Sequence, residues 1–166
     1  MGDATVRAAM QSFLQNANIP GIENVYADAP WFLSEKAWEM QNNGGWGAIA
    51  FIHLDDAVET PITVTAVTGN KQITHTVSII IIYQYLIPSG FNKSGPDSWV
   101  GPLDNIIDAV KAAIRSSPDL GVPSVIFNAG RNNADIRQER ELPVRSETRI
   151  DSWNRIEITV QEIIVA

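Results

Sequence analysis

The clearest hydrophobic pattern in the chain lies in residues 74–87, where apolar side chains recur at every second position. This period of two predicts a β-strand, and Ile80 and Ile82 extend the apolar character to its second face. An unpaired strand with four consecutive isoleucines would aggregate, so we expect paired edges on both sides and a central position in the sheet. At about 3.3 Å per residue the strand would extend on the order of 45 Å, and we expect one end to leave the subunit body and contact another molecule.

Other segments also carry strand patterns. Strands are predicted at residues 23–27, 46–54, 62–68, 124–128, 141–149 and 154–165. We expect a turn at residues 55–56, a hairpin that pairs residues 62–68 with residues 74–87, and a connection between the last two strands at residues 151–153. A change of phase in the last strand predicts a bulge near residues 161–162.

Two segments have the spacing of amphipathic helices. The first covers residues 4–16, and the second opens at Gly101-Pro102 and ends at Ser117-Pro118. Residues 31–47 resemble an inserted segment rich in Trp and Gly, within which residues 34–41 could form one or two helical turns, and residues 129–140 are predicted to be a long loop. Residues 1–166 therefore predict a single α+β domain: a mainly antiparallel sheet of about five or six strands with two main helices packed on one face.

The composition is that of an ordinary soluble globular protein, with 45% hydrophobic and 19% charged residues. No apolar run approaches the ~20 residues of a membrane helix, so we expect no membrane contact. Residues 1–15 lack a basic segment followed by an apolar block, so we expect no signal peptide and a protein that stays where it is made. The absence of cysteine excludes disulfides, zinc–thiolate sites and cysteine nucleophiles.

The charge is uneven along the chain. The net charge of −7 argues against nonspecific nucleic-acid binding, and the excess lies in residues 1–110, which hold four basic and eleven acidic side chains. Residues 111–166 hold eight of each, with the signs interleaved. Such a pattern fits either a solvated hairpin or a set of ion pairs between subunits. On the second interpretation, the candidate residues for contacts between subunits are Arg131, Arg137, Arg140, Arg145, Arg149 and Trp153.

No combination of residues completes a catalytic or metal site. His53 and Asp55 would point to the same face of a strand, but the only other histidine, His75, lies on a different strand. No G-x-S-x-G sequence is present, and the glycines at residues 44–47 lack the helix and lysine of a phosphate-binding loop. We therefore expect no catalytic residue, no metal and no cofactor, and a protein that is not an enzyme.

The order of elements resembles the tail-terminator proteins of long-tailed bacteriophages. The stretches that carry the resemblance are the first helix leading into residues 19–26 and Pro30, the apolar strand at residues 74–87, the helix PLDNIIDAVKAAI (102–114) and the closing RIDSWNRIEITVQEIIVA (149–166). The resemblance implies a structural protein that forms a ring, expected to be a hexamer, at the head-proximal end of the tail tube. Such a ring stops tube polymerisation and offers a joining surface to the head connector.

The expected partners are therefore further copies of the chain, the tail tube protein and the head–tail connector protein, with nucleic acid present only as DNA that passes through the ring. The expected location is the virion tail, after assembly in the host cytoplasm. The nearest alternative is another head–tail connector or neck protein of the same virion. Alternatives of other classes are a small α+β enzyme that uses His53 and Asp55, and a nucleic-acid module, which the net acidity disfavours.

Overall fold

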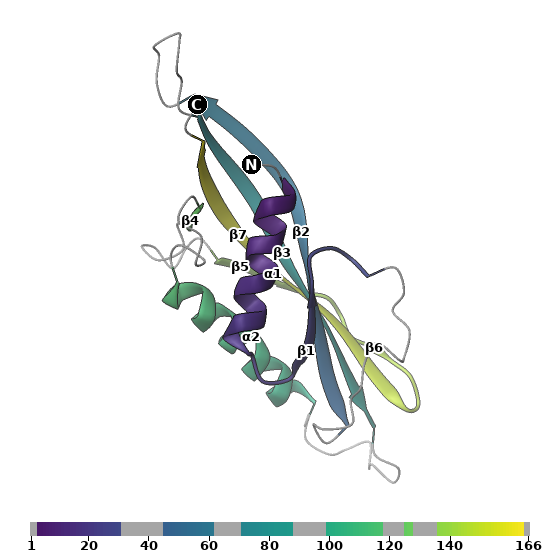
Figure 1. Cartoon of the computed structure of the whole chain (residues 1–166). Helices are drawn as coiled ribbons and strands as arrows, with labels where there is room; N and C mark the ends of the chain where they lie inside the picture. The colour runs from purple at the N-terminus through teal and green to yellow at the C-terminus, as the bar shows by residue number, and fades with distance from the viewer. Residues whose placement is uncertain are drawn as a thin grey trace.

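The alternating patterns fold into one mixed sheet, and both helices pack on the same face of it (Figure 1). The computed structural model describes residues 3–30, 45–61, 71–87, 99–117, 125–127 and 136–164. The helices are α1 (Asp3–Ala17) and α2 (Val100–Ser116). The strands are β1 (Ile22–Tyr26), β2 (Trp46–Pro61), β3 (Lys71–Leu86), β4 (Val125–Phe127), β5 (Ile136–Arg140), β6 (Val144–Arg145) and β7 (Arg149–Ile164).

The strands are ordered β1-β2-β3-β7, and β4, β5 and β6 all pair with the remaining edge of β7. Only β1 and β2 are parallel, and every other pair is antiparallel. The sheet has seven strands when the two-residue β6 is counted, close to the five or six expected. The predicted α+β class, with a mainly antiparallel sheet and helices on one face, is confirmed.

The central position predicted for the isoleucine-rich strand is also confirmed. β3 pairs with β2 on one edge and with β7 on the other along its whole length. Each of these three strands has 16 residues and so extends about 50 Å, whereas the helices of 15 and 17 residues reach only about 22 to 25 Å. The long strands therefore project beyond the helices that cover their middle (Figure 1).

The main core lies between the sheet and the helices. The odd-numbered residues of β3 from Val77 to Tyr83 are fully buried against α1 and α2. The helices contribute their apolar stripes, which consist of Val6, Met10 and Leu14 from α1 and Leu103, Ile106, Ile107, Val110 and Ile114 from α2. Burial of each large aliphatic side chain contributes roughly 1.5–3 kcal/mol, so this layer holds the helices on the sheet.

The second face of the sheet has a smaller apolar cluster. Ile49, Phe51 and Ile82 are buried there, and Tyr26 and Ile80 pack against them. The middle of β3 therefore has apolar packing on both faces, as its sequence predicts.

Several boundaries differ from the prediction. Residues 55–56 do not end a strand in a turn, because β2 continues to Pro61 with a bulge between Leu54 and Asp56. Residues 151–153 lie inside β7, and the connection predicted there falls instead at residues 146–148. β7 pairs with β3 without a shift of register, so the bulge predicted at residues 161–162 is wrong.

The predicted loop at residues 129–140 is wrong for its last part, because residues 136–140 form β5 along β7. The polar, charged residues of β5 suit a strand at a solvated edge, which composition alone does not separate from a loop. Trp46 and Gly47, assigned to the inserted segment, belong to β2. The predictions for residues 31–44, residues 62–68 and Arg131 lie outside the described residues.

Candidate functional site

The face of the sheet away from the helices, here called the open face, carries a polar cluster on three neighbouring strands. The bulge in β2 directs Asp55 toward Ser78 of β3 and Arg155 of β7. Nη2 of Arg155 lies 2.8 Å from Oδ1 of Asp55 and 3.1 Å from Oε2 of Glu157. Nε of Arg155 donates a hydrogen bond of 2.7 Å to Oγ of Ser78, and the Ser78 hydroxyl in turn donates to Asp55. The cluster therefore ties β2, β3 and β7 together through side chains.

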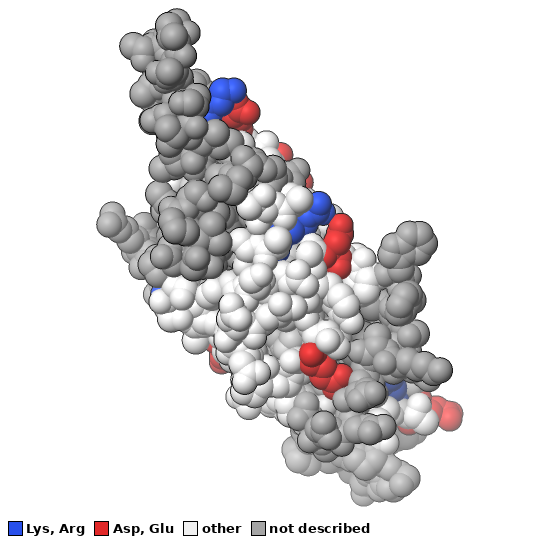
Figure 2. All heavy atoms as spheres, viewed as in Figure 1, with Lys and Arg blue, Asp and Glu red and all other residues white. Residues whose placement is uncertain are grey.

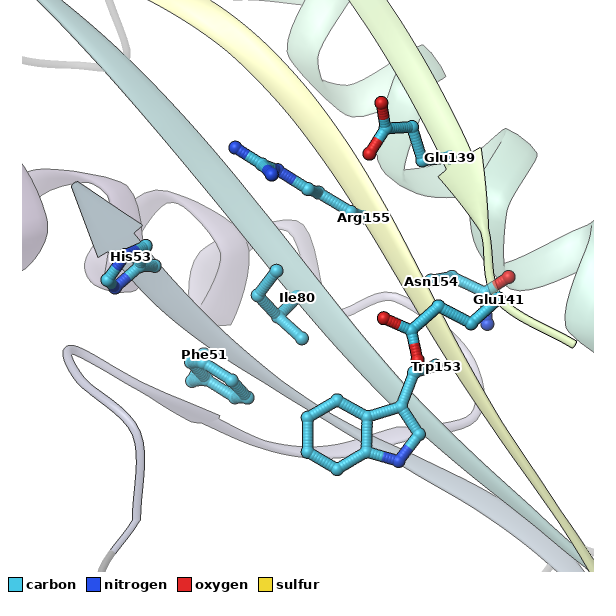
Figure 3. Close-up of a pocket in the computed structure, with 8 residues that line it drawn as sticks. All are labelled: Phe51, His53, Ile80, Glu139, Glu141, Trp153, Asn154 and Arg155. Atoms are coloured by element: carbon cyan, nitrogen blue, oxygen red, sulfur yellow. The ribbon is translucent and has the colours of Figure 1, made fainter. Parts of the chain in front are cut away.

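A hollow of about 360 Å³ lies beside this cluster (Figure 3). Its volume is within the range of ligand pockets in proteins. Figure 3 shows Arg155 extending from β7 toward β3, Phe51 and Ile80 on one side of the hollow, the Glu141 carboxylate beside Trp153, and Glu139 beyond Arg155. The lining residues are Phe51, His53, Ile80, Glu139, Glu141, Trp153, Asn154 and Arg155.

The hollow has an apolar wall and an acidic wall. Phe51, Ile80 and Trp153 form the apolar wall, and Trp153 is 37% exposed. Glu139 and Glu141 form the acidic wall, and the backbone N–H of Glu141 donates to the carbonyl oxygen of Trp153 at 3.0 Å. Because Arg155 already contacts two carboxylates, the hollow as a whole favours a group that is partly apolar and positively charged.

His53 and Asp55, considered above as an acid–base pair, lie close together, but Asp55 already contacts two other side chains. Nε2 of His53 lies 3.8 Å from Oδ1 of Asp55, while the two oxygens of Asp55 contact Arg155 and Ser78. These contacts bind Asp55 to β3 and β7, so its side chain takes part in the cluster that joins the strands. Within the described ranges no group of three or more His, Cys, Asp or Glu residues is arranged to hold a metal ion.

A hairpin arm extends from the edge of the sheet where β7 begins. We define the arm as residues 142–148, which run from the end of β5 through β6 to the turn before β7 (Figure 1). All of its residues are exposed, and two of them are apolar: Leu142 is 92% exposed and Val144 is 68% exposed. Exposed aliphatic side chains on a thin projecting hairpin cannot be buried within the same chain, so they are candidates for contact with another molecule.

The predicted interface arginines do not form one group in the structure. Arg137 lies 2.7 Å from Glu139 on the same strand, and Arg140 pairs with Asp104 of α2. Nε of Arg149 lies 3.0 Å from Oδ2 of Asp151. Of the predicted set, Arg145 lies in the arm and has no ion pair with a described residue. Trp153 lines the hollow.

Two polar residues buried in the core, Ser152 and Asn154, are linked by a hydrogen bond and contribute to the packing of the fold rather than to a functional site. Nδ2 of Asn154 donates to Oγ of Ser152 at 3.3 Å, and Tyr83 pairs with Ser152 across the sheet. The Tyr83 hydroxyl has no hydrogen-bond partner in the described part of the chain. Burial raises the pKa of Tyr83 above its usual range, and neighbouring Tyr85 adds to the shift.

The helix-covered face carries scattered charges. In the view of Figure 2, the charged side chains among the described residues are separated by broad uncharged areas, and no extended basic patch is visible. Nonspecific nucleic-acid binding uses such a patch, and the described residues on this face do not form one. None of the described helices has the length and apolar character that a bilayer crossing requires.

Sequence reasoning missed the apolar residues of the arm and the arginine cluster. Leu142 and Val144 flank Pro143 in a charge-rich segment, and this isolated apolar pair is the signal that could have identified them. The contacts among Asp55, Ser78 and Arg155 depend on the bulge in β2 and on the strand register, which no local pattern indicates.

Comparison with known proteins does not assign the chain to a family: no protein-family model matches it, and no significant match is found among curated proteins.

Proposed function

We propose that this protein is a structural subunit that closes the head-proximal end of a bacteriophage tail tube, where copies of it form a ring. The proposal rests on the resemblance in element order to tail-terminator proteins. Among the structural features, the exposed arm supports it best, because a subunit of a closed assembly needs a surface that only a neighbour can cover.

Two further features favour assembly over catalysis. The long strands project beyond the helices, which gives the subunit extended edges at both ends of the sheet. β1 covers β2 only along residues 48–51, and no described strand pairs with the same edge of β2 beyond residue 52. Open strand edges and projecting hairpins are means by which subunits contact one another or a polymer end.

A ring at the end of a tube has a defined physical task. One surface must complement the last ring of the tube, and the opposite surface must not offer a second copy of the tube's own binding surface. Growth then stops because the next tube subunit finds no matching site. The same opposite surface is free to contact the head connector.

Loss of the protein from the virus tests the proposal against its nearest alternative. Without a terminator, tail tubes should be overlong or unfinished in electron micrographs of infected-cell lysates. Finished tails of normal length beside separate heads would instead favour a connector or neck protein. A His53→Ala variant of the purified protein that loses a measurable enzymatic turnover would favour the enzyme alternative.

A further inference from the structure

We propose that the arm of one copy docks into the hollow of a second copy, with Val144 and Leu142 against the apolar wall and Arg145 against the acidic wall. This inference rests on the proposed ring and names the contact that joins its subunits. It assigns a function to two features that are separate within one chain: an exposed apolar arm and an open hollow on the sheet.

The two walls of the hollow match the two faces of the arm. Val144 pairs with Asp151 and Arg145 with Ile150, so the side chains of Val144 and Arg145 leave β6 on opposite faces. A β6 edge that enters the hollow would therefore bring an aliphatic side chain to Trp153 and a guanidinium to Glu141. Apolar and charge complementarity would then be satisfied together.

The charges support this occupant. The hollow and its immediate partners hold four carboxylates, from Asp55, Glu139, Glu141 and Glu157, but only two guanidinium groups, from Arg137 and Arg155. The arm carries one guanidinium, that of Arg145, and one carboxylate, that of Glu147, so it is neutral overall. The guanidinium of Arg145 is attracted to the acidic recess, whereas contact between two recesses would bring like charges together and is disfavoured.

The arm cannot fill the hollow of its own chain. Glu141 and Arg145 are four residues apart in an extended segment, which separates their Cα atoms by about 13 Å. The arm also runs away from the hollow along the start of β7, because Arg145 pairs with Ile150 while Trp153 lies further along the strand. The occupant must therefore come from another molecule.

Side chains rather than backbone would make this contact. Pro143 has no backbone N–H, so the outer edge of the arm lacks a donor next to Val144. A proline at this point disfavours simple extension of the sheet by a further strand. Since the arm and the hollow are different surfaces, the contact is head-to-tail, and such contacts close into rings when the rotation per subunit permits.

The direct test is the assembly state of purified variants, measured by analytical ultracentrifugation over a range of concentrations. Val144→Asp and Arg145→Glu should each raise the concentration at half-assembly roughly tenfold or more, the size expected for a central interface residue. Ala112→Asp is the control, because Ala112 is also an exposed apolar residue but lies on α2, away from the arm, the hollow and the open edge of β2. It should assemble like the unmodified chain.

Mixing variants tests the head-to-tail geometry. Val144→Asp retains a working hollow, and Glu141→Arg retains a working arm, so each alone should stay monomeric while an equal mixture forms a heterodimer and nothing larger. A chain that carries both Glu141→Arg and Arg145→Glu should regain assembly, because the exchanged charges meet between copies. Circular dichroism confirms folding, and Glu141 is exposed, so its replacement should leave the core intact.

Unmodified chains that remain monomeric at every concentration would overturn the inference, and so would variants that assemble normally. Tail tubes provide a separate readout of the proposed function. Variants that assemble normally and still cap tubes would refute the arm–hollow contact and leave the capping function standing. Variants that lose assembly as expected, in a protein whose unmodified form never binds tubes, would support the contact and refute the capping function.

Discussion

The Arg155 cluster gives a stability prediction whose size follows from the structure. Replacement by alanine removes the contacts of Arg155 with Asp55 (2.8 Å), Glu157 (3.1 Å) and the Ser78 hydroxyl (2.7 Å). A hydrogen bond to a charged group contributes roughly 1.5–3 kcal/mol when protected from water. The side chains of Arg155 and Asp55 are 35% and 23% exposed, so solvent screening reduces the total, and we expect a loss of about 2 kcal/mol.

Thermal and denaturant unfolding can measure this loss. For a domain of this length, about 2 kcal/mol corresponds to a fall in Tm of roughly 4–8 °C. The matched control is Arg137→Ala, which removes an arginine of the same face whose side chain is 68% exposed and pairs only with Glu139 among the described residues. This control should change the free energy of unfolding by no more than about 0.5 kcal/mol.

A double-mutant cycle separates the ion pair from the general effect of a shortened side chain. Asp55→Ala, Arg155→Ala and the double variant should show a coupling energy of about 1 kcal/mol or more. Equal stabilities of Arg155→Ala and Arg137→Ala, together with a coupling energy near zero, would refute the view that this cluster ties the three long strands together.

Three further substitutions, one of them with a matched control, test the fold. Ile79→Ala should cost about 2–5 kcal/mol in denaturant unfolding, because Ile79 is fully buried in the central strand. Gly21→Ala should cost more than about 1 kcal/mol, because Gly21 has φ +92° and an added Cβ would lie 2.5 Å from Trp46, whereas Gly101→Ala meets no atom within 4 Å and should be neutral or stabilising. Tyr83→Phe should preserve or raise stability near neutral pH, because the buried hydroxyl has no described partner. Since the folded-state pKa of Tyr83 is raised, the unfolded chain loses this proton first, so the stability of the unmodified protein should fall above about pH 10, and Tyr83→Phe should reduce that fall in alkaline titrations.

Much of the architecture could be predicted from the sequence because its signals are local and strong. The unbroken alternation around Ile79 and Ile81 identifies a central strand, and the helical spacing that includes Ile106 and Val110 identifies a helix packed on the sheet. In both segments the apolar periodicity and the burial agree, so the element type follows from residues close together in the chain.

The errors lie where pairing partners decide the structure. Asp55 and Asp56 carry a turn composition, yet β3 keeps both of them in β2 across a bulge. Residues 151–153 also have a turn composition, but β3 pairs with all three on one side, and on the other side Val144 pairs with Asp151 and the N–H of Glu141 donates to the carbonyl oxygen of Trp153. Hydrogen bonding to neighbouring strands outweighs local preference in such segments.

The candidate site was only partly accessible to sequence reasoning for a similar reason. The sequence predicted a group of interface arginines, but Arg140 pairs with Asp104 of α2 and Arg137 pairs with Glu139 of its own strand. Of the predicted residues, Arg145 lies in the arm and Trp153 lines the hollow. The hollow combines residues from four strands and the segment after β5, so it exists only once the register of the sheet is set.

Electron microscopy of the purified protein mixed with tail tubes from the same virion tests the central claim most directly. The proposed function predicts a ring of this protein at one end of each tube and no further growth when tube subunits are added. Tubes with bare ends that continue to lengthen in a saturating excess of folded protein would contradict it.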